Sequence, residues 1–331
     1  MSSRTIFQGA KVEKRNEIRG KTKKKDEQGL IIKKYQQYLK LEKSLSKNTL
    51  EAYLTDLEKL LSFLSAEGVE ILEVSLTDLQ RFAAGLHDIG IHARSQARII
   101  SGIKSFFHFL IIADYIEADP SELLEGPKIG FKLPEVLTVE EIDRIISTID
   151  LSKNEGQRNR AILETLYSCG LRVSELTGLK LSDLYFDEGF IKVEGKGSKQ
   201  RLVPISPKAI QEIKLYFLDR NRINIKKDHE DYLFLSRRGT HLSRIMIFHL
   251  IKELADMAGI TQNISPHTFR HSFATHLLEG GANLRAIQCM LGHESISTTE
   301  IYTHIDRNML RSEIIEHHPR NIKYRKEREI H

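Results

Sequence analysis

Apolar residues recur at helical spacing through the first third of the chain. Residues 30–39 carry them on one face, and residues 50–64 carry leucine or tyrosine three and four positions apart. Both spacings predict amphipathic helices. The capping-box pattern of residues 77–80 predicts the start of a third helix that runs toward His87, and residues 93–113 predict a fourth. The pattern therefore predicts an all-helical first domain over residues 26–124.

The fourth predicted helix also carries a basic face. Its apolar side contains Ile99 and Ile103, whereas Arg94, Arg98 and Lys104 recur on another side. Such a face either follows the phosphates of a nucleic acid or is simply solvated, and the second case is the commoner one. Both interpretations stay open at this point.

A linker separates this domain from the rest of the chain. Helical periodicity stops between residues 125 and 136, where Pro127 follows a glycine and Pro134 follows a leucine. Thr138 and Glu141 then form a capping-box pattern that predicts a new helix. These signals predict a linker over residues 125–136 and a second domain over residues 137–320.

The second domain combines helices with a small sheet. Residues 159–169 predict an apolar helix that ends at Gly170, and period-two patterns in residues 190–194 and 201–205 predict a β-hairpin with Lys196 at its exposed tip. Further along, we expect helices from residue 206 and over 243–257, with a short strand at 232–235. The predicted fold class is therefore mainly α with a small antiparallel β-sheet, in two domains.

The segment 265–304 holds several chemically active side chains. Ser265 and Pro266 predict a helix start, and Gly280 predicts its end. His267 and Arg270 lie three apart and therefore share a face. The residues expected to form a buried stripe on this helix are Phe269, Phe273, Leu277 and Leu278. A histidine and an arginine beside a packed stripe suit an anionic ligand better than a metal.

Charge is concentrated at the N-terminus. Residues 1–25 contain nine Lys or Arg and two Glu, a balance of +7, so the rest of a chain with net charge +5 carries −2. A body that binds nucleic acid must therefore sort its basic residues onto one face. We interpret residues 1–25 as a basic, disordered arm that either adds non-specific DNA contact or is a solvated tail. Residues 321–331 are a charged C-terminal tail.

Composition excludes two protein classes. No apolar run reaches the roughly 20 residues of a membrane span, because the longest candidate, residues 99–112, contains Lys104 and His108. The basic N-terminus does not fit a secretory signal. The two cysteines, Cys169 and Cys289, lie in apolar helical contexts, which favours buried reduced thiols. We therefore expect a cytoplasmic protein with no membrane partner.

Six polar residues have the chemistry for attack on a phosphodiester. They are Arg172, Lys196, His267, Arg270, His293 and Tyr302. Two guanidiniums grip phosphate oxygens and stabilise the charge of a pentacoordinate transition state. A tyrosine acts as covalent nucleophile, histidines move protons, and a lysine protonates the leaving alkoxide. Such a set needs no metal and no other cofactor. Glu175 lies three residues after Arg172, where an ion pair is the simplest interpretation.

Several spaced motifs resemble the tyrosine recombinase (phage integrase) family, and the closest resemblance is to the Xer recombinases that resolve chromosome dimers. In chain order the motifs are Gly-Leu-Arg172-Val-Ser-Glu175-Leu, Gly-Lys196-Gly-Ser-Lys-Gln-Arg, Pro-His267-Thr-Phe-Arg270-His-Ser-Phe-Ala-Thr-His, Leu-Gly-His293 and Ser-Thr-Thr-Glu-Ile-Tyr302-Thr-His. The resemblance extends from about residue 28 to Arg320. One such motif alone would be weak, but several in the right order are highly specific.

The resemblance implies a role for each motif residue. Tyr302 matches the nucleophile that forms a 3′-phosphotyrosine, and Arg172 and Arg270 match the phosphate clamp. Lys196 matches the general acid and His267 the proton-transfer histidine. His293 matches a residue that contacts the phosphate or assists the tyrosine, and Glu175 matches a supporting acidic position.

The resemblance also implies an assembly. Residues 26–124 match the core-binding, SAM-like DNA-binding domain, which clamps a double-stranded recombination site together with the catalytic domain. Family members exchange strands through a Holliday junction as tetramers of one chain or of two paralogues, without ATP or metal. For the Xer members, the resemblance further implies a septal DNA translocase of the FtsK type as a partner. Residues 306–317 resemble the helix that relatives donate to a neighbouring protomer, with Leu310, Ile314 and Ile315 as docking residues.

Other interpretations stay open from the sequence. A phage or mobile-element integrase uses the same chemistry on different DNA, and a type IB topoisomerase-like enzyme shares it without programmed strand exchange. A non-enzymatic DNA-binding regulator explains the helices and the basic arm, but not the six catalytic residue types together. A zinc site at His267, His271 and His276 lacks the glutamate of the metalloprotease motif and any cysteine ligand.

Overall fold

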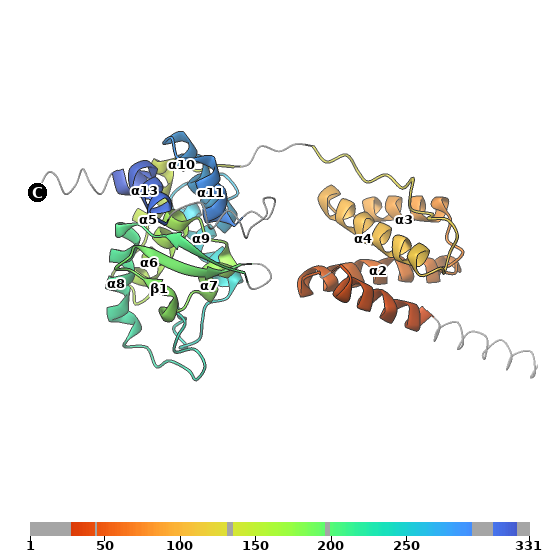
Figure 1. The fold of residues 1–331 in the computed structure, drawn as a ribbon, viewed down its shortest axis with the longest axis horizontal. Helices are drawn as coiled ribbons and strands as arrows, with labels where there is room; N and C mark the ends of the chain where they lie inside the picture. The colour runs from red at the N-terminus through yellow and green to blue at the C-terminus, as the bar shows by residue number, and fades with distance from the viewer. Residues whose placement is uncertain (1–27, 44, 131–134, 196–198, 293–306, 323–331) are drawn as a thin grey trace, which may run out of the picture. The chain divides into compact units, whose positions relative to one another are not determined.

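The computed structural model describes residues 28–43, 45–130, 135–195, 199–292 and 307–322. These residues are mostly helical, with one small antiparallel sheet (Figure 1). Contacts divide the chain into two compact units, residues 1–131 and residues 132–331. The fold class expected from the sequence is confirmed.

The first unit is a helical domain. Residues 28–41 are helical, and α2 (Lys47–Glu67), α3 (Leu76–Asp88) and α4 (Ala93–Ile112) follow. The helix α2 begins where the Ser46 side chain accepts from the Thr49 amide, and it ends at Gly68, whose φ of 70° suits a residue without Cβ. Tyr35, Leu60 and Phe107 lie in the core, which is closed mainly by packing between α2 and α4.

The helix α3 begins earlier than the sequence predicts. Ser75, not Thr77, is the N-cap: the Ser75 hydroxyl accepts from the Asp78 amide, and the Asp78 carboxylate accepts from the Ser75 amide at 2.9 Å. Asp78 is therefore the third helical residue of a reciprocal capping box. The core residues of this helix are Leu79, Phe82 and Leu86.

Two residues of the predicted basic face of α4 stabilise their own domain. Both terminal nitrogens of Arg98 bond the carboxylate of Asp56, one of them at 2.9 Å, and Asp56 is completely buried. A buried carboxylate without such a partner would be strongly destabilising. Lys104 donates to the Glu122 carbonyl at 3.2 Å. The charge of Arg98 is therefore compensated within the fold.

The second unit surrounds a buried helix. Its elements are α5 (Val139–Ser147), α6 (Gly156–Cys169), α7 (Val173–Gly178), η1 (Leu181–Asp183), β1 (Leu184–Tyr185), β2 (Phe190–Glu194), β3 (Gln200–Pro204), α8 (Pro207–Arg220), α9 (Arg244–Met257), α10 (Pro266–Glu279), α11 (Leu284–Leu291) and α13 (Arg307–His317). Helix α6 is buried along most of its length and packs against α8 and α10. The sheet order is β1-β2-β3, all antiparallel, with Ile191 opposite Val203.

Two local predictions in this unit are wrong. Residues 232–235 form no strand: Tyr232 pairs only with Lys180, and Leu235 only with His241, as isolated bridges. Single pairings on both sides leave no continuous ladder for a strand to extend. Leu278 is 53% exposed, although Phe269, Phe273 and Leu277 are buried. These three recur every four residues, and Leu278 is rotated away from their stripe.

The helix α13 packs on its own unit, which differs from the expectation that it is donated to a neighbour. Leu310 and Ile314 are 5% and 1% exposed, in a cluster with Phe273, Leu277 and Met290. Helices α10, α11 and α13 lie together in Figure 1, as their contacts also show. The cluster is small, so its two α13 residues are a substantial part of its buried apolar surface.

Candidate active site

Arg172 lies at a sharp reversal between two helices. Helix α6 ends at Gly170, which has φ of 57°, and a Cβ there would lie 2.3 Å from the Phe273 ring. Arg172 is then the N-cap of α7, where its backbone amide donates to the Glu175 carboxylate at 2.8 Å. Glycine is therefore required at position 170 for this close turn, which is followed directly by the contacts between Arg172 and Glu175.

Three arginines surround one buried carboxylate; we call Arg172, Arg201, Arg270 and Glu175 the arginine cluster. Arg172 Nη1 and Arg201 Nη1 lie 2.9 and 2.7 Å from Glu175 Oε1, and Arg201 Nη2 lies 2.9 Å from Oε2. Arg270 Nη1 is 3.9 Å from Oε2. The Glu175 side chain is only 1% exposed, so these contacts lie largely out of water.

The two proposed clamp arginines differ in exposure. The Arg172 side chain is 34% exposed, whereas that of Arg270 is 10% exposed. Arg270 donates to the Gly170 carbonyl at 2.8 Å and to the Leu291 carbonyl, so it joins the end of α6 to the end of α11. Burial, together with the charge of Arg172, lowers the pKa of Arg270 to about 10. Arg270 therefore remains charged at neutral pH.

Glu175 holds its negative charge inside the protein. Burial alone would raise the pKa of its carboxyl, but hydrogen bonds and charge from Arg201, followed by bonds from Arg172, lower the pKa below its ordinary value. An ionised Glu175 compensates one of the three guanidinium charges. The arginine cluster therefore carries a net charge of +2.

His267 lies one turn before Arg270 on α10 and is exposed. Partial loss of hydration, together with the positive environment of His271, Arg270 and Arg172, lowers the pKa of its imidazole. The ring is therefore neutral at pH 7 and able to accept a proton.

Three predicted site residues lie outside the described residues: Lys196, His293 and Tyr302. The described glycines that precede two of them border the arginine cluster. A Cβ on Gly195 would lie 3.4 Å from Arg201 Nη1, and one on Gly292 would lie 3.2 Å from Arg201 Cζ. Arg172 Nη2 also donates to the Gly292 carbonyl at 3.2 Å. Gly195 and Gly292 therefore lie beside the arginine cluster, directly before Lys196 and His293 in the chain.

Sequence reasoning missed Arg201 as a site residue. The residue stands in the Gly-Lys196-Gly-Ser-Lys-Gln-Arg motif, in which Lys196 has the more evident chemistry. The alternation of side chains along β3 indicates that Arg201 is buried, because it shares the inward face of the strand with Val203. An arginine at a buried strand position requires a carboxylate or carbonyl partner.

The three histidines considered for zinc do not converge. His276 is buried and shares a 2.8 Å hydrogen bond with the Tyr167 hydroxyl, whereas His267 is exposed. Within the described part of the chain, no group of three His, Cys, Asp or Glu side chains is placed to hold a metal ion.

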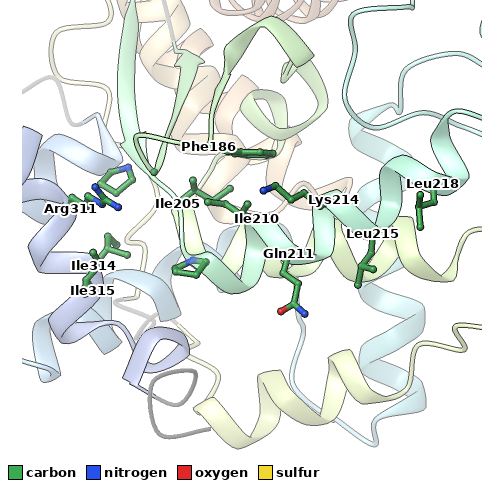
Figure 2. A pocket seen from close by; sticks show the side chains of 13 residues that line it. Phe186, Ile205, Ile210, Gln211, Lys214, Leu215, Leu218, Arg311, Ile314 and Ile315 are labelled. Carbon is green, nitrogen blue, oxygen red and sulfur yellow. The ribbon is translucent and has the colours of Figure 1, made fainter. Parts of the chain in front are cut away.

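An open pocket of about 500 Å³ lies elsewhere in the second unit. Figure 2 shows Ile205 and Ile210 on one side and Ile314, Ile315 and Arg311 on another. No member of the arginine cluster lines it. This pocket is therefore separate from the candidate active site, which is marked by a buried carboxylate and the arginines around it.

Comparisons with known proteins match both units. Residues 135–309 match the model of the phage integrase family, and residues 32–113 match the model of the phage integrase N-terminal SAM-like domain. The chain belongs to the phage integrase family. Its members include tyrosine recombinases that are similar to this chain over most of its length.

Two relatives and one solved structure illustrate the similarity. The tyrosine recombinase XerD of Staphylococcus saprophyticus is 44% identical over 291 residues, which cover 88% of this chain and 99% of the relative. XerD of Chlorobaculum tepidum is 45% identical over 287 residues, covering 86% and 94%. A structure of the XerH site-specific recombinase bound to palindromic difH substrate matches with a TM-score of 0.64 and 25% identity, covering 80% of this chain and 79% of that one.

This membership makes the chain a tyrosine site-specific recombinase, an enzyme that acts on DNA. Among the described residues, no helix is both long and apolar enough to cross a membrane.

Proposed function

We propose that this chain is a Xer-type recombinase that resolves chromosome dimers and uses Tyr302 as its nucleophile. Attack of the Tyr302 oxygen on the scissile phosphorus forms a 3′-phosphotyrosine and releases a 5′-hydroxyl. A second 5′-hydroxyl then attacks the phosphotyrosine, releases the tyrosine and joins a new strand. Two such exchanges pass through a Holliday junction.

The observation that carries the proposal is the net charge of the arginine cluster. Three guanidiniums around one ionised carboxylate leave +2 at a partly open site. A phosphodiester carries −1, and its pentacoordinate transition state approaches −2, so the attraction strengthens as the reaction proceeds. The charge that a metal ion would supply is already present in Arg172 and Arg270, and the reaction needs no cofactor.

The remaining roles complete the proton transfers. His267, which is neutral at pH 7, accepts the proton of the Tyr302 hydroxyl. Lys196 donates a proton to the leaving 5′-oxygen, and His293 hydrogen-bonds the phosphate. Glu175 orients Arg172 through its two contacts with that residue.

The proposed partners follow from the relatives. The enzyme acts on a double-stranded recombination site as a tetramer of this chain, or of this chain and a paralogue, in the cytoplasm at the nucleoid. A septal DNA translocase of the FtsK type activates it during cell division. The support is the similarity to XerD recombinases over most of the chain and to XerH bound to difH.

Covalent capture in cells tests this proposal. DNA attached to the wild-type chain is recovered under denaturing conditions and sequenced, with Tyr302→Phe as the control. We expect one chromosomal inverted repeat near the replication terminus, and no recovery with the variant. Recovery of the ends of a mobile element would contradict chromosome resolution and indicate an integrase.

A further inference from the structure

Arg201 occupies the meeting point of four chain segments in the second unit. Its side chain extends from β3 and bonds Glu175 on α7 and the Met290 carbonyl on α11. It also lies close to Gly195 and Gly292. We propose that Arg201 is a positioning residue that keeps Arg172 and Arg270 free to bind the scissile phosphate. The inference rests on the recombinase function proposed above and adds a residue to its machinery.

Arg201 is too enclosed to bind the substrate itself. Its side chain is 5% exposed, and each nitrogen of the guanidinium already donates. Nε lies 2.8 Å from Met290 O, and the two terminal nitrogens lie 2.7 and 2.9 Å from the two oxygens of Glu175. Arg201 therefore acts through its neighbours, and its paired contact fixes the plane of the carboxylate.

Loss of Arg201 would change the charge available from the two clamp arginines, Arg172 and Arg270. Glu175 is ionised and buried, and Arg201 is its most enclosed partner. Without Arg201, the carboxylate would be compensated only by Arg172, which already touches it, and by Arg270, now 3.9 Å away. Both clamp residues would turn toward Glu175, because an unpaired buried charge is costly. Less positive charge would then remain for the phosphate.

Arg201 also lies where two chain segments leave the arginine cluster, one after Gly195 and one after Gly292. Gly195 directly precedes Lys196, and Gly292 directly precedes His293. Gly292 has φ of 65°, and a Cβ there would lie 3.2 Å from the Arg201 guanidinium carbon. The Arg201 bond to Met290 O holds the end of α11 two residues earlier. One side chain thus fixes the described starting points of both segments relative to Glu175.

The test measures single-turnover cleavage and DNA affinity separately. The probe is a nicked synthetic duplex that carries the site recovered by covalent capture. The variants are Arg201→Gln, Arg201→Lys, Glu175→Gln and the double variant Arg201→Gln/Glu175→Gln. The matched control is Arg220→Gln: Arg220 is 4% exposed in the same unit, but its partners are the carbonyls of Glu230, Tyr232 and Leu233.

We expect Arg201→Gln to slow cleavage at saturating DNA about 100-fold, a loss typical of removing one electrostatic contribution to a phosphate site, with DNA affinity changed less than about threefold. Arg201→Lys, which keeps the positive charge but loses the paired contact with Glu175, slows cleavage about tenfold. The double variant cleaves at least about tenfold faster than Arg201→Gln, because it removes the unpaired carboxylate. Arg220→Gln lowers the melting temperature but cleaves within about threefold of the wild type.

Two results overturn the inference. One is cleavage by Arg201→Gln and Arg201→Lys at the rate of Arg220→Gln. The other is a double variant whose losses simply multiply, since independent effects mean that Arg201 does not act through Glu175. A wild-type chain that forms no covalent adduct would instead overturn the recombinase function itself, and the inference with it.

Discussion

At the scale of single residues, the site consists of charges that compensate one another incompletely. Glu175 is ionised although it is buried, because three arginines surround it. Arg270 is held by the carbonyls of Gly170 and Leu291, whereas the Arg172 side chain remains 34% exposed. In the proposed function, the enclosed Arg270 and the more accessible Arg172 would form a preorganised phosphate site, because little reorganisation would be needed when the substrate binds.

The lowered pKa of His267 predicts the pH dependence of cleavage. Because the imidazole is neutral above its lowered pKa, the cleavage rate should be constant near pH 7 and fall as the pH drops through that pKa. His267→Gln should slow cleavage at pH 7 about 10²- to 10³-fold and abolish the acidic limb. The measurement is single-turnover cleavage as a function of pH.

His271→Gln is the matched control for the dependence of the cleavage rate on pH. The charge of His271 is one cause of the lowered His267 pKa, so its removal should move the acidic limb to higher pH while the limb persists. An acidic limb that survives in His267→Gln would assign the proton transfer to another group.

The sequence allowed some site residues to be predicted and not others. Arg172, His267 and Arg270 could be named because they lie in short motifs, and the structure brings Arg172 and Arg270 together around Glu175. Arg201 was missed because its role depends on contacts with α7 and α11, which are distant in sequence. The roles of Lys196, His293 and Tyr302 stay predictions, because these residues lie outside the described ones.

At the scale of elements, local signals determine the helices and their caps, whereas non-local packing determines strand pairing and which helices pack together. The capping box of Thr138 and Glu141 appears as predicted, because both partners lie within one turn. The strand expected at residues 232–235 is absent, because its partners provide single bridges only. The position of α13 depends on apolar contacts with α10 and α11, and helical periodicity alone cannot specify a packing partner.

The residues after α13 attach it to α6 through a buried histidine. His318 is fully buried; its Nε2 donates to the Tyr167 carbonyl at 3.2 Å, and its Nδ1 accepts from the Arg320 amide at 3.2 Å. Burial, together with the charges of Arg320 and His276, lowers the pKa of His318 to about 3. A neutral ring is thus part of the folded structure.

His318 should make stability depend on pH. Its unfolded-state pKa near ~6.5 exceeds the folded value, so the unfolded chain binds more protons and stability falls as pH falls from about 6.5 toward 3. Between pH 6.5 and 5, His318 should contribute a loss of about 1 to 2 kcal/mol in the free energy of unfolding. His318→Gln should remove that contribution, as measured by urea unfolding at the two pH values.

His249→Gln provides the control, since His249 is exposed on α9. This variant should keep the pH dependence of the wild type. Equal losses between pH 6.5 and 5 in the wild type and His318→Gln would contradict the assignment to His318.

At the scale of the whole molecule, the chain consists of a helical unit and a unit that contains the arginine cluster. Net charge is a poor guide to this organisation, because the +7 of residues 1–25 exceeds the +5 of the entire chain. The charges that matter for the proposed chemistry are few, and they gather in the arginine cluster. The first unit instead uses Arg98 and Asp56 to hold α2 against α4.

The most direct test of the central claim is the identity of the covalent bond to DNA. The wild-type chain is incubated in excess EDTA with a nicked duplex that carries its site, and the adduct is digested and sequenced by mass spectrometry. We predict a phosphotyrosine at Tyr302 in an amount unaffected by EDTA, and no adduct from Tyr302→Phe, which still binds the duplex. An adduct on another residue, an adduct formed by Tyr302→Phe, or loss of cleavage in EDTA would contradict the account.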